Sequence, residues 1–322
     1  MRQFAKPTIV VSKCLEFDAC RYNGEMIPDV TIRNLQPFVT FIPVCPEVEI
    51  GLGTPRETIR IVEENGENRL VQPSTREDVT EKMEQFSNDF LQTISDVDGF
   101  ILKNRSPSCG TRDVKIYSGF EKAPAKGKGS GLFGGAVVKN FSHLPIEEEG
   151  RLSNFIIREH FFTRLFTLAY YKMIKHNKNM KDLVSFQSDN KYLFMAYNQV
   201  KQKELGRIIA NHKNEKIEVV FENYEKTLYK LFMRTPRYTS NVNVCEHIFG
   251  YFKTKLKKQE KDHFIELLQK YAEKKIPLSS LLTILKSWAI RFDEKYLLRQ
   301  TYFEPYPEAL VEISDSGKGR DY

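Results

Sequence analysis

Three of the five cysteines in this sequence stand in places where their thiols could bind a metal. Cys14, Cys45 and Cys109 each come shortly after a run of β-branched or apolar residues that is typical of a strand. The loops at the carboxyl ends of parallel strands gather at one edge of an open α/β sheet. We therefore expect these distant thiols to meet in space. Thiolates are the soft ligands that iron–sulfur clusters require, and three ligands would leave one iron open to a substrate.

The residues beside these cysteines have restricted or unusual backbones. Pro46 and Pro107 constrain their neighbours, and Gly110 permits dihedral angles that other residues avoid. The alternative is that the cysteines are small buried residues in tight turns, and for any one of them alone that interpretation is favoured. For three cysteines in polar loops, a metal or cluster site is favoured. Cys20 is a fourth candidate ligand, although ordinary burial suits it better, and Cys245 is expected in the core.

The elements that would position these loops alternate between strands and helices. Strands are expected at residues 8–11, 38–44, 58–62, 69–71, 99–103 and 114–117, with a hairpin turn at 64–66. The capping-box spacing of Ser74 and Glu77 is expected to open a helix. This alternation predicts an α/β domain, layered on a mostly parallel sheet, over residues 1–150. Residues 120–150 are expected to be loop-like. Within them the Gly- and Lys-rich residues 123–131 lack the spacing of a phosphate loop and are expected to form a mobile loop beside the site. Residues 147–150 are expected to end the domain.

Residues 151–322 are expected to form an all-α domain. Amphipathic patterns run over residues 152–176, 191–212, 215–234, 241–274 and 279–299. Residues 1–150 hold 18 Lys and Arg against 22 Asp and Glu, a net charge of −4, whereas residues 151–322 hold 31 against 20, a net charge of +11. Such asymmetry is typical of a polyanion-binding module joined to another domain. The lysines crowded at 253–261 are candidate nucleic-acid contacts, and a solvated helix face is an equal alternative.

The composition indicates in which cellular compartment such a chain is expected. Hydrophobic residues make up 41% of the sequence, as in a soluble globular protein. No apolar run approaches the ~20 residues that a membrane helix needs, and the first residues lack the apolar region of a secretory signal. A cytoplasmic location is therefore expected, with no membrane association. In that compartment five cysteines do not indicate a disulfide framework. No protein partner is predicted.

Several motifs, in order along the chain, resemble the thiouracil desulfidase family. They are VSKCL at residues 11–15, CRYNG at 20–24, PVCPE at 43–47, GLGTPR at 51–56 and RSPSCG at 105–110. Residues 151–310 resemble a second, uncharacterised domain that is often fused to the first, and the fused form is similar to bacterial tRNA 4-thiouridine desulfidases. The resemblance implies a 4Fe–4S cluster bound by Cys14, Cys45 and Cys109, with one open iron.

The resemblance also implies an activity, the non-redox conversion of 4-thiouridine in tRNA to uridine with release of hydrosulfide. Glu47 matches the catalytic acid/base of the family, and Ser106 matches its catalytic serine, with Ser108 as the neighbouring candidate. Sulfur would bind the open iron while Glu47 takes a proton from water. Taken without the family, Glu47 is a surface carboxylate or helix cap and Ser106 a turn residue.

Other roles remain open around these motifs. Arg21, Arg56 and Arg105 would stabilise thiolates, contact phosphate or form structural salt bridges, and Arg56 and Arg105 are the better candidates for the pocket. A desulfidase of free thiouracil bases is the alternative within the same chemistry. A cluster-dependent hydro-lyase is a second enzyme class. A basic RNA-binding protein with a structural metal is the non-catalytic alternative.

Overall fold

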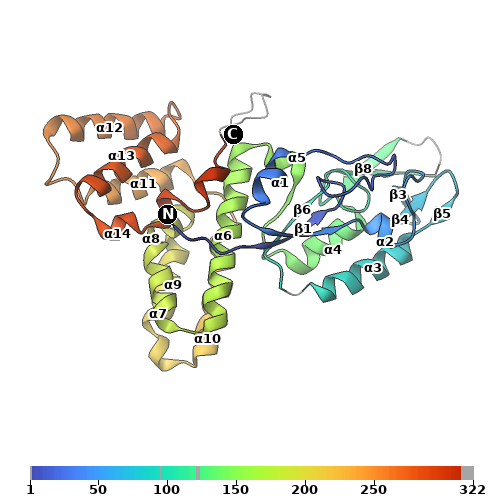
Figure 1. Cartoon of the computed structure of the whole chain (residues 1–322), viewed down its shortest axis with the longest axis horizontal. Helices are drawn as coiled ribbons and strands as arrows, with labels where there is room; N and C mark the ends of the chain where they lie inside the picture. Colours follow the sequence, from blue (N-terminus) through green and yellow to red (C-terminus); the bar gives the residue numbers. More distant parts are fainter. Residues whose placement is uncertain (1, 95, 121–123, 313–322) are drawn as a thin grey trace. The chain divides into compact units, whose positions relative to one another are not determined.

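The chain divides into two compact units, which are described separately (Figure 1). The computed structural model describes residues 2–94, 96–120 and 124–312. Within these, the first unit comprises residues 2–169 and 307–312, and the second comprises Tyr170–Tyr306. The division falls inside helix α6 (Phe155–Asn177), later than the boundary at residue 150 that the sequence favours. The early turns of α6 belong to the first unit, where Phe166 packs edge-on against Phe4 with ring centroids 5.9 Å apart.

The first unit contains a parallel four-stranded sheet in the order β2-β1-β6-β9. Its strands are β1 (Thr8–Ser12), β2 (Thr40–Val44), β6 (Gly99–Leu102) and β9 (Ile146–Glu148). The inner strand β1 is covered on both faces, since Ile9, Val10 and Val11 are fully buried. All four strands point the same way, so their carboxyl ends lie at one edge. The predicted α/β class with a mostly parallel sheet is confirmed.

A second, mixed sheet in the same unit was not anticipated. Its order is β5-β4-β3-β7-β8, from β3 (Arg60–Glu64), β4 (Glu67–Gln72), β5 (Glu77–Asp78), β7 (Val114–Tyr117) and β8 (Ala125–Gly129). The predicted hairpin joins β3 to β4, and Asn65 and Gly66 adopt the positive φ values of its turn, 53° and 84°. The loop predicted over 120–150 is wrong for most of its described length. There β8 pairs with β7, and a helix over Leu132–Phe141 and the strand β9 follow. Residues 121–123 lie outside the described residues.

The helices of the first unit cover the two sheets (Figure 1). They are α1 (Val30–Leu35), α2 (Pro46–Glu49), α3 (Thr80–Thr93), α4 (Leu132–Phe141) and α5 (Glu149–Leu152), with the 3₁₀ turn Glu308–Leu310. The predicted capping box is wrong, because Glu77 belongs to β5 and α3 begins at Thr80. Phe90 of α3 and Phe133 of α4 pack with ring centroids 5.9 Å apart in the core. The Phe133 ring is fully buried, which stabilises the unit by about 1.5–3 kcal/mol, whereas Phe90 is only partly buried.

The second unit is helical, as predicted. It contains α7 (Met180–Asp189), α8 (Lys191–Tyr197), α9 (Gln199–Ala210), α10 (Ile217–Leu231), α11 (Tyr238–Phe249), α12 (Lys258–Ala272), α13 (Leu278–Arg291) and α14 (Lys295–Leu298), with 3₁₀ turns at His212–Asn214 and Thr301–Phe303. The sequence predicts a break at 177–179, and the last residue of that break begins a helix. Asn179 caps α7 because its side chain accepts from the Lys181 amide at 2.9 Å. No helix among the described residues has the length and apolar character to cross a membrane.

Candidate functional site

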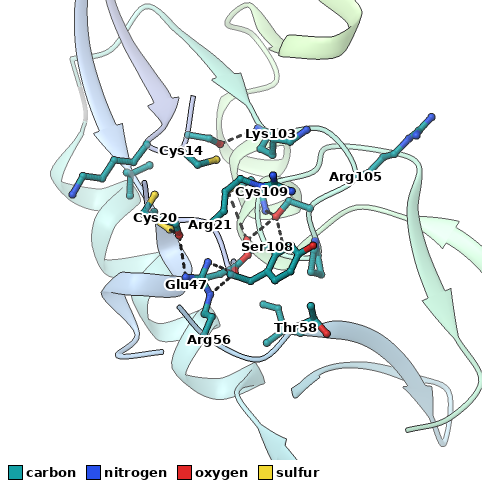
Figure 2. Close-up of a pocket in the computed structure, with 18 of the residues that line it drawn as sticks. Cys14, Cys20, Arg21, Glu47, Arg56, Thr58, Lys103, Arg105, Ser108 and Cys109 are labelled. Atoms are coloured by element: carbon teal, nitrogen blue, oxygen red, sulfur yellow. Dashed lines mark hydrogen bonds and ion pairs between the residues drawn. The ribbon is translucent and has the colours of Figure 1, made fainter. Parts of the chain in front are cut away.

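A pocket of about 350 Å³ lies at the edge of the parallel sheet where β1, β2 and β6 end (Figure 2). Cys14, Cys45 and Cys109 all line this pocket, and Cys20 joins them. Cys45 follows β2 directly and is the N-cap residue of α2. The prediction that thiols far apart in sequence converge at one edge of the sheet is therefore confirmed. Whether the three bind a cluster stays a prediction.

The electrostatic setting of these thiols is unusual for cysteine. Cys20, Cys45 and Cys109 are buried, and Cys14 is half-buried. Burial raises the pKa of Cys14 and of Cys20 to about 12, and the nearby Cys45 adds to both shifts. Burial likewise raises the pKa of Cys109 well above its usual value, against an opposing hydrogen bond from Ser12. Such crowded thiols stay neutral unless a cation compensates the charge of their thiolates.

The donor geometry bears on the kind of metal that would fit. Among the described residues, no group of three His, Cys, Asp or Glu side chains is arranged to hold a single metal ion. A polynuclear cluster has a different requirement, because each cysteine binds a separate iron. Its ligand sulfurs therefore stand farther apart than the ligands of one ion. The cysteines that line the pocket are soft donors of the kind that iron–sulfur clusters use.

The loop that carries Cys109 is tightly fixed from within. The Ser106 hydroxyl oxygen accepts hydrogen bonds from the backbone N–H groups of Ser108 and Cys109, at 3.3 and 3.1 Å. Gly110 closes the turn on the Ser106 carbonyl at 2.9 Å. The start of α4 lies directly against this loop, where a Cβ on Gly134 would collide with the carbonyl oxygens of Cys109 and Gly110. Only glycine permits so close an approach.

The same loop is anchored at both ends by carboxylates that the sequence analysis missed. Glu149 accepts from the Asn104 amide at 2.7 Å and also binds the neighbouring lysine ammonium. Glu148 accepts from the Thr111 and Arg112 amides at 2.7 and 3.2 Å. Both carboxylates are buried at the end of β9, which runs beside β6. The sequence predicts only the end of a domain at these glutamates, and the signal for their role is that they follow a strand that ends at this edge of the sheet.

Glu47 is held by hydrogen bonds from an arginine and a serine that line the same pocket. Arg56 donates from Nε and Nη2 to Glu47 Oε2, at 2.9 and 2.5 Å, and from Nη1 to the Cys20 carbonyl at 3.0 Å. The Ser108 hydroxyl donates to Glu47 Oε1 at 2.6 Å. Because the Ser108 hydroxyl proton is used in the bond to Glu47, the Ser106 hydroxyl, 2.9 Å away, is the donor in its contact with Ser108.

The predicted site residues thus take distinct places. Glu47 lines the pocket, and both serines do so as well. Ser108 donates to the Glu47 carboxylate directly. Ser106, the serine that the sequence favours, reaches that carboxylate only through its hydrogen bond to Ser108. The Arg56 side chain is only 4% exposed and is committed to Glu47. Its place is that of a positioning residue.

Comparisons with known proteins divide the chain in a similar way. A family model described as 2-thiouracil desulfurase matches residues 9–149, and one described as a protein of unknown function, DUF1722, matches residues 191–307. The uncharacterized protein YbbK of Bacillus subtilis (strain 168) is 36% identical over 118 residues, which cover 34% of this chain and 77% of YbbK. The uncharacterized protein YbgA of Escherichia coli (strain K12) is 24% identical over 156 residues, which cover 48% of this chain and 92% of YbgA. The solved structure of the 4Fe–4S-dependent thiouracil desulfidase TudS has 25% sequence identity and a TM-score of 0.37, and the match covers 46% of this chain and 93% of that one.

Proposed function

Since the chain belongs to the 2-thiouracil desulfurase family, we propose that it hydrolyses the carbon–sulfur bond of a thiolated uracil. The substrate that we propose is 4-thiouridine in tRNA, which would become uridine with release of hydrosulfide. The observation that carries the proposal is the convergence of Cys14, Cys45 and Cys109 on the pocket that also holds Glu47. In this proposal the three thiols are the metal ligands and Glu47 is the general base, and all four line the same pocket.

The donor set fits the cofactor that we propose, a 4Fe–4S cluster held by Cys14, Cys45 and Cys109. Their loops come from three strands, and because burial raises the pKa values of Cys14 and Cys109, these two thiols need a bound cation to become thiolates. Cys20 remains as a fourth thiol beside this set. When bound with one iron free of cysteine, the cluster supplies a Lewis acid for the thiocarbonyl sulfur.

The chain's own residues supply the proton transfer. In the overall reaction one water replaces sulfur by oxygen at the ring carbon, and the sulfur leaves as hydrogen sulfide with the two protons of that water, or as hydrosulfide with the second proton passed to solvent. No electrons are gained or lost. Arg56 occupies Glu47 Oε2, so Oε1 keeps acceptor capacity for a proton from the attacking water. Ser108 orients this carboxylate through its hydroxyl, and Ser106 in turn orients Ser108.

The charge of the second unit supports a nucleic-acid substrate. Tyr170–Tyr306 hold 26 Lys and Arg against 15 Asp and Glu, a net charge of +11, while the rest of the chain carries −4. Phosphate contacts by such cations supply salt-dependent affinity for RNA. Of the lysines crowded at 253–261, Lys255 pairs with Glu294, whereas Lys258 and Lys261 have no carboxylate partner among the described residues. We propose that these two contact tRNA phosphates.

Hydrosulfide release from two substrates tests the proposal. Protein purified without oxygen is incubated with tRNA that contains 4-thiouridine or with free 4-thiouracil. We expect release from tRNA, and we expect the Lys258→Glu/Lys261→Glu variant to lose tRNA turnover while a Lys270→Glu variant keeps it, since Lys270 is already paired with Glu266 on the same helix. Release from the free base alone would select the free-base desulfidase instead. No release from either substrate would overturn the proposal.

A further inference from the structure

Three tyrosines of the second unit, Tyr192, Tyr251 and Tyr296, form a cluster of rings. Tyr192 lies in α8, Tyr296 lies in α14, and Tyr251 follows the end of α11. The rings of Tyr251 and Tyr296 are stacked, with centroids 6.2 Å apart and an interplanar angle of 23°. The Tyr192 ring meets the Tyr296 ring edge-on, with centroids 6.4 Å apart. Three segments that are distant in the chain thus bring their rings together.

The tyrosine cluster leaves one of its three rings open to solvent. Tyr192 is 3% exposed and Tyr296 is half-buried, whereas Tyr251 is 38% exposed. The Tyr192 hydroxyl donates to the Tyr251 hydroxyl at 3.3 Å, so the exposed ring is held at its tip as well as by stacking. A ring that is already held in place loses little further conformational entropy when another flat group stacks on it.

Two exposed lysines beside the tyrosine cluster have no carboxylate partner among the described residues. The Lys191 ammonium lies over the Tyr192 ring, 5.4 Å from its centroid. Lys253 follows Tyr251 by two residues, and its ammonium lies 5.7 Å from the centroid of the Phe249 ring. Other cations near the cluster are already paired, namely Lys255 with Glu294, Lys295 with Asp293 and Arg299 with Asp189. The exposed ring is therefore accompanied by two cations whose charge no carboxylate balances.

We propose that the tyrosine cluster binds an unpaired RNA base, which stacks on Tyr251 while Lys191 and Lys253 contact the flanking phosphates. The inference rests on the proposed function, which makes RNA the substrate, and it adds a binding site on the second unit. Every base has a flat face, so an exposed aromatic ring binds bases with little regard to sequence, and lysines add affinity for the phosphates. The net charge of +11 on this unit favours RNA over an apolar protein partner.

Two synthetic strands with equal numbers of phosphates test the stacking. One is an oligouridine of about 12 nucleotides, and the other has the same length but carries ribose without bases. Their affinities for the full-length protein are measured by fluorescence anisotropy. We expect the unaltered protein to bind oligouridine about tenfold more tightly than the base-free strand. Tyr251→Leu should bind the two strands alike, and Tyr251→Phe, which keeps the ring, should keep most of the preference.

Matched variants separate stacking from charge and from misfolding. Tyr170→Leu is the control for an exposed ring, because Tyr170 is 37% exposed and packs against Phe186, outside the cluster. It should leave both affinities unchanged. Lys191→Gln/Lys253→Gln should weaken both strands alike and reduce the slope of log affinity against log salt by about 0.7 per lysine. A preference for oligouridine that persists in Tyr251→Leu, or none in the unaltered protein, contradicts the inference.

Photochemical crosslinking of the unaltered protein needs no variant and decides the case if Tyr251→Leu loses affinity for both strands through misfolding. Irradiated 5-iodouridine couples to an aromatic side chain that lies against it. With 5-iodouridine in the oligouridine, we expect the crosslinked peptide to contain Tyr251. A crosslink found only outside the tyrosine cluster refutes the inference.

The failure of this inference is distinguishable from that of the proposed function, because neither strand contains a thiolated base. If the protein releases no hydrosulfide from any substrate, the proposed function fails, and the loss of the oligouridine preference in Tyr251→Leu still supports the base-binding site. If the protein desulfurates tRNA but binds the two strands alike, the inference about the tyrosine cluster fails alone.

Discussion

Replacing Glu148 by alanine should release one end of the Cys109 loop. Glu148 is 3% exposed and its Oε1 accepts from the Thr111 amide at 2.7 Å, the Thr111 hydroxyl at 3.0 Å and the Arg112 amide at 3.2 Å. Alanine removes the acceptor and leaves two backbone N–H groups without it. The loop then keeps its other carboxylate anchor, the Glu149 bond to Asn104, and its backbone hydrogen bonds to the start of α4. We expect the loop to open locally while the sheet stays folded.

The size of the effect follows from those three bonds. A hydrogen bond to a charged group contributes about 1.5–3 kcal/mol. The three are not additive, because they share one oxygen atom and because Arg112 is exposed, so water replaces part of what is lost. We therefore expect the free energy of local opening to fall by about 2–4 kcal/mol. At a factor of ten for every 1.4 kcal/mol, the amides of Thr111 and Arg112 should exchange roughly 30- to 700-fold faster.

Hydrogen exchange of the Thr111 and Arg112 amides measures the effect of Glu148→Ala, and a Glu147→Ala variant is the control. Glu147 is 6% exposed, and among the described residues its carboxylate bonds only to the side chains of Arg112 and Arg151, which are 49% and 39% exposed. Burial raises the pKa of Glu147, so losing its charge costs little. We expect Glu147→Ala to leave the exchange of both amides nearly unchanged. Equal exchange in the two variants, or none gained in Glu148→Ala, would refute the view that Glu148 anchors the loop.

Three further predictions follow from single contacts. Glu47→Gln should lower hydrosulfide release about 100-fold or more without loss of iron, because the amide is no base although it still accepts from Ser108. Gly134→Ala should lower the free energy of unfolding in urea by roughly 1–3 kcal/mol, because its Cβ would collide with the Cys109 carbonyl. Burial and then Arg164 lower the pKa of His160 to about 3. The unfolded chain therefore takes up that proton first, and stability should be lost by about 1 kcal/mol per pH unit as pH falls below about 6.5. His160→Gln should show a flatter stability profile in urea between pH 7 and pH 5.

The sequence predicts those parts of the fold that depend on local patterns. The strands that end before Cys14 and Cys45, and the turn at Asn65 and Gly66, follow from β-branched runs and turn residues. The second sheet does not follow from such patterns, because β7 pairs in parallel with the distant β3. Helix α7 was missed because Asn179 was interpreted as a breaker, whereas its side chain caps the helix.

The candidate site divides in the same way. The convergence of the cysteines follows from sheet geometry alone. Which serine contacts Glu47 depends on loop dihedrals such as the positive φ of Arg105, which no periodicity predicts. The anchoring role of Glu148 needs the pairing of β9 with β6, a contact between residues far apart in the chain.

The binding of a cluster by the strand-end thiols is tested most directly by iron and sulfide analysis of protein purified and reconstituted without oxygen. We predict about four irons and four sulfides per chain. The variants Cys14→Ala, Cys45→Ala and Cys109→Ala should each lose most of that content, and Cys245→Ala, altered in the helical core, should retain it. Stoichiometric zinc in place of iron, or full iron content in all three pocket variants, would contradict the account.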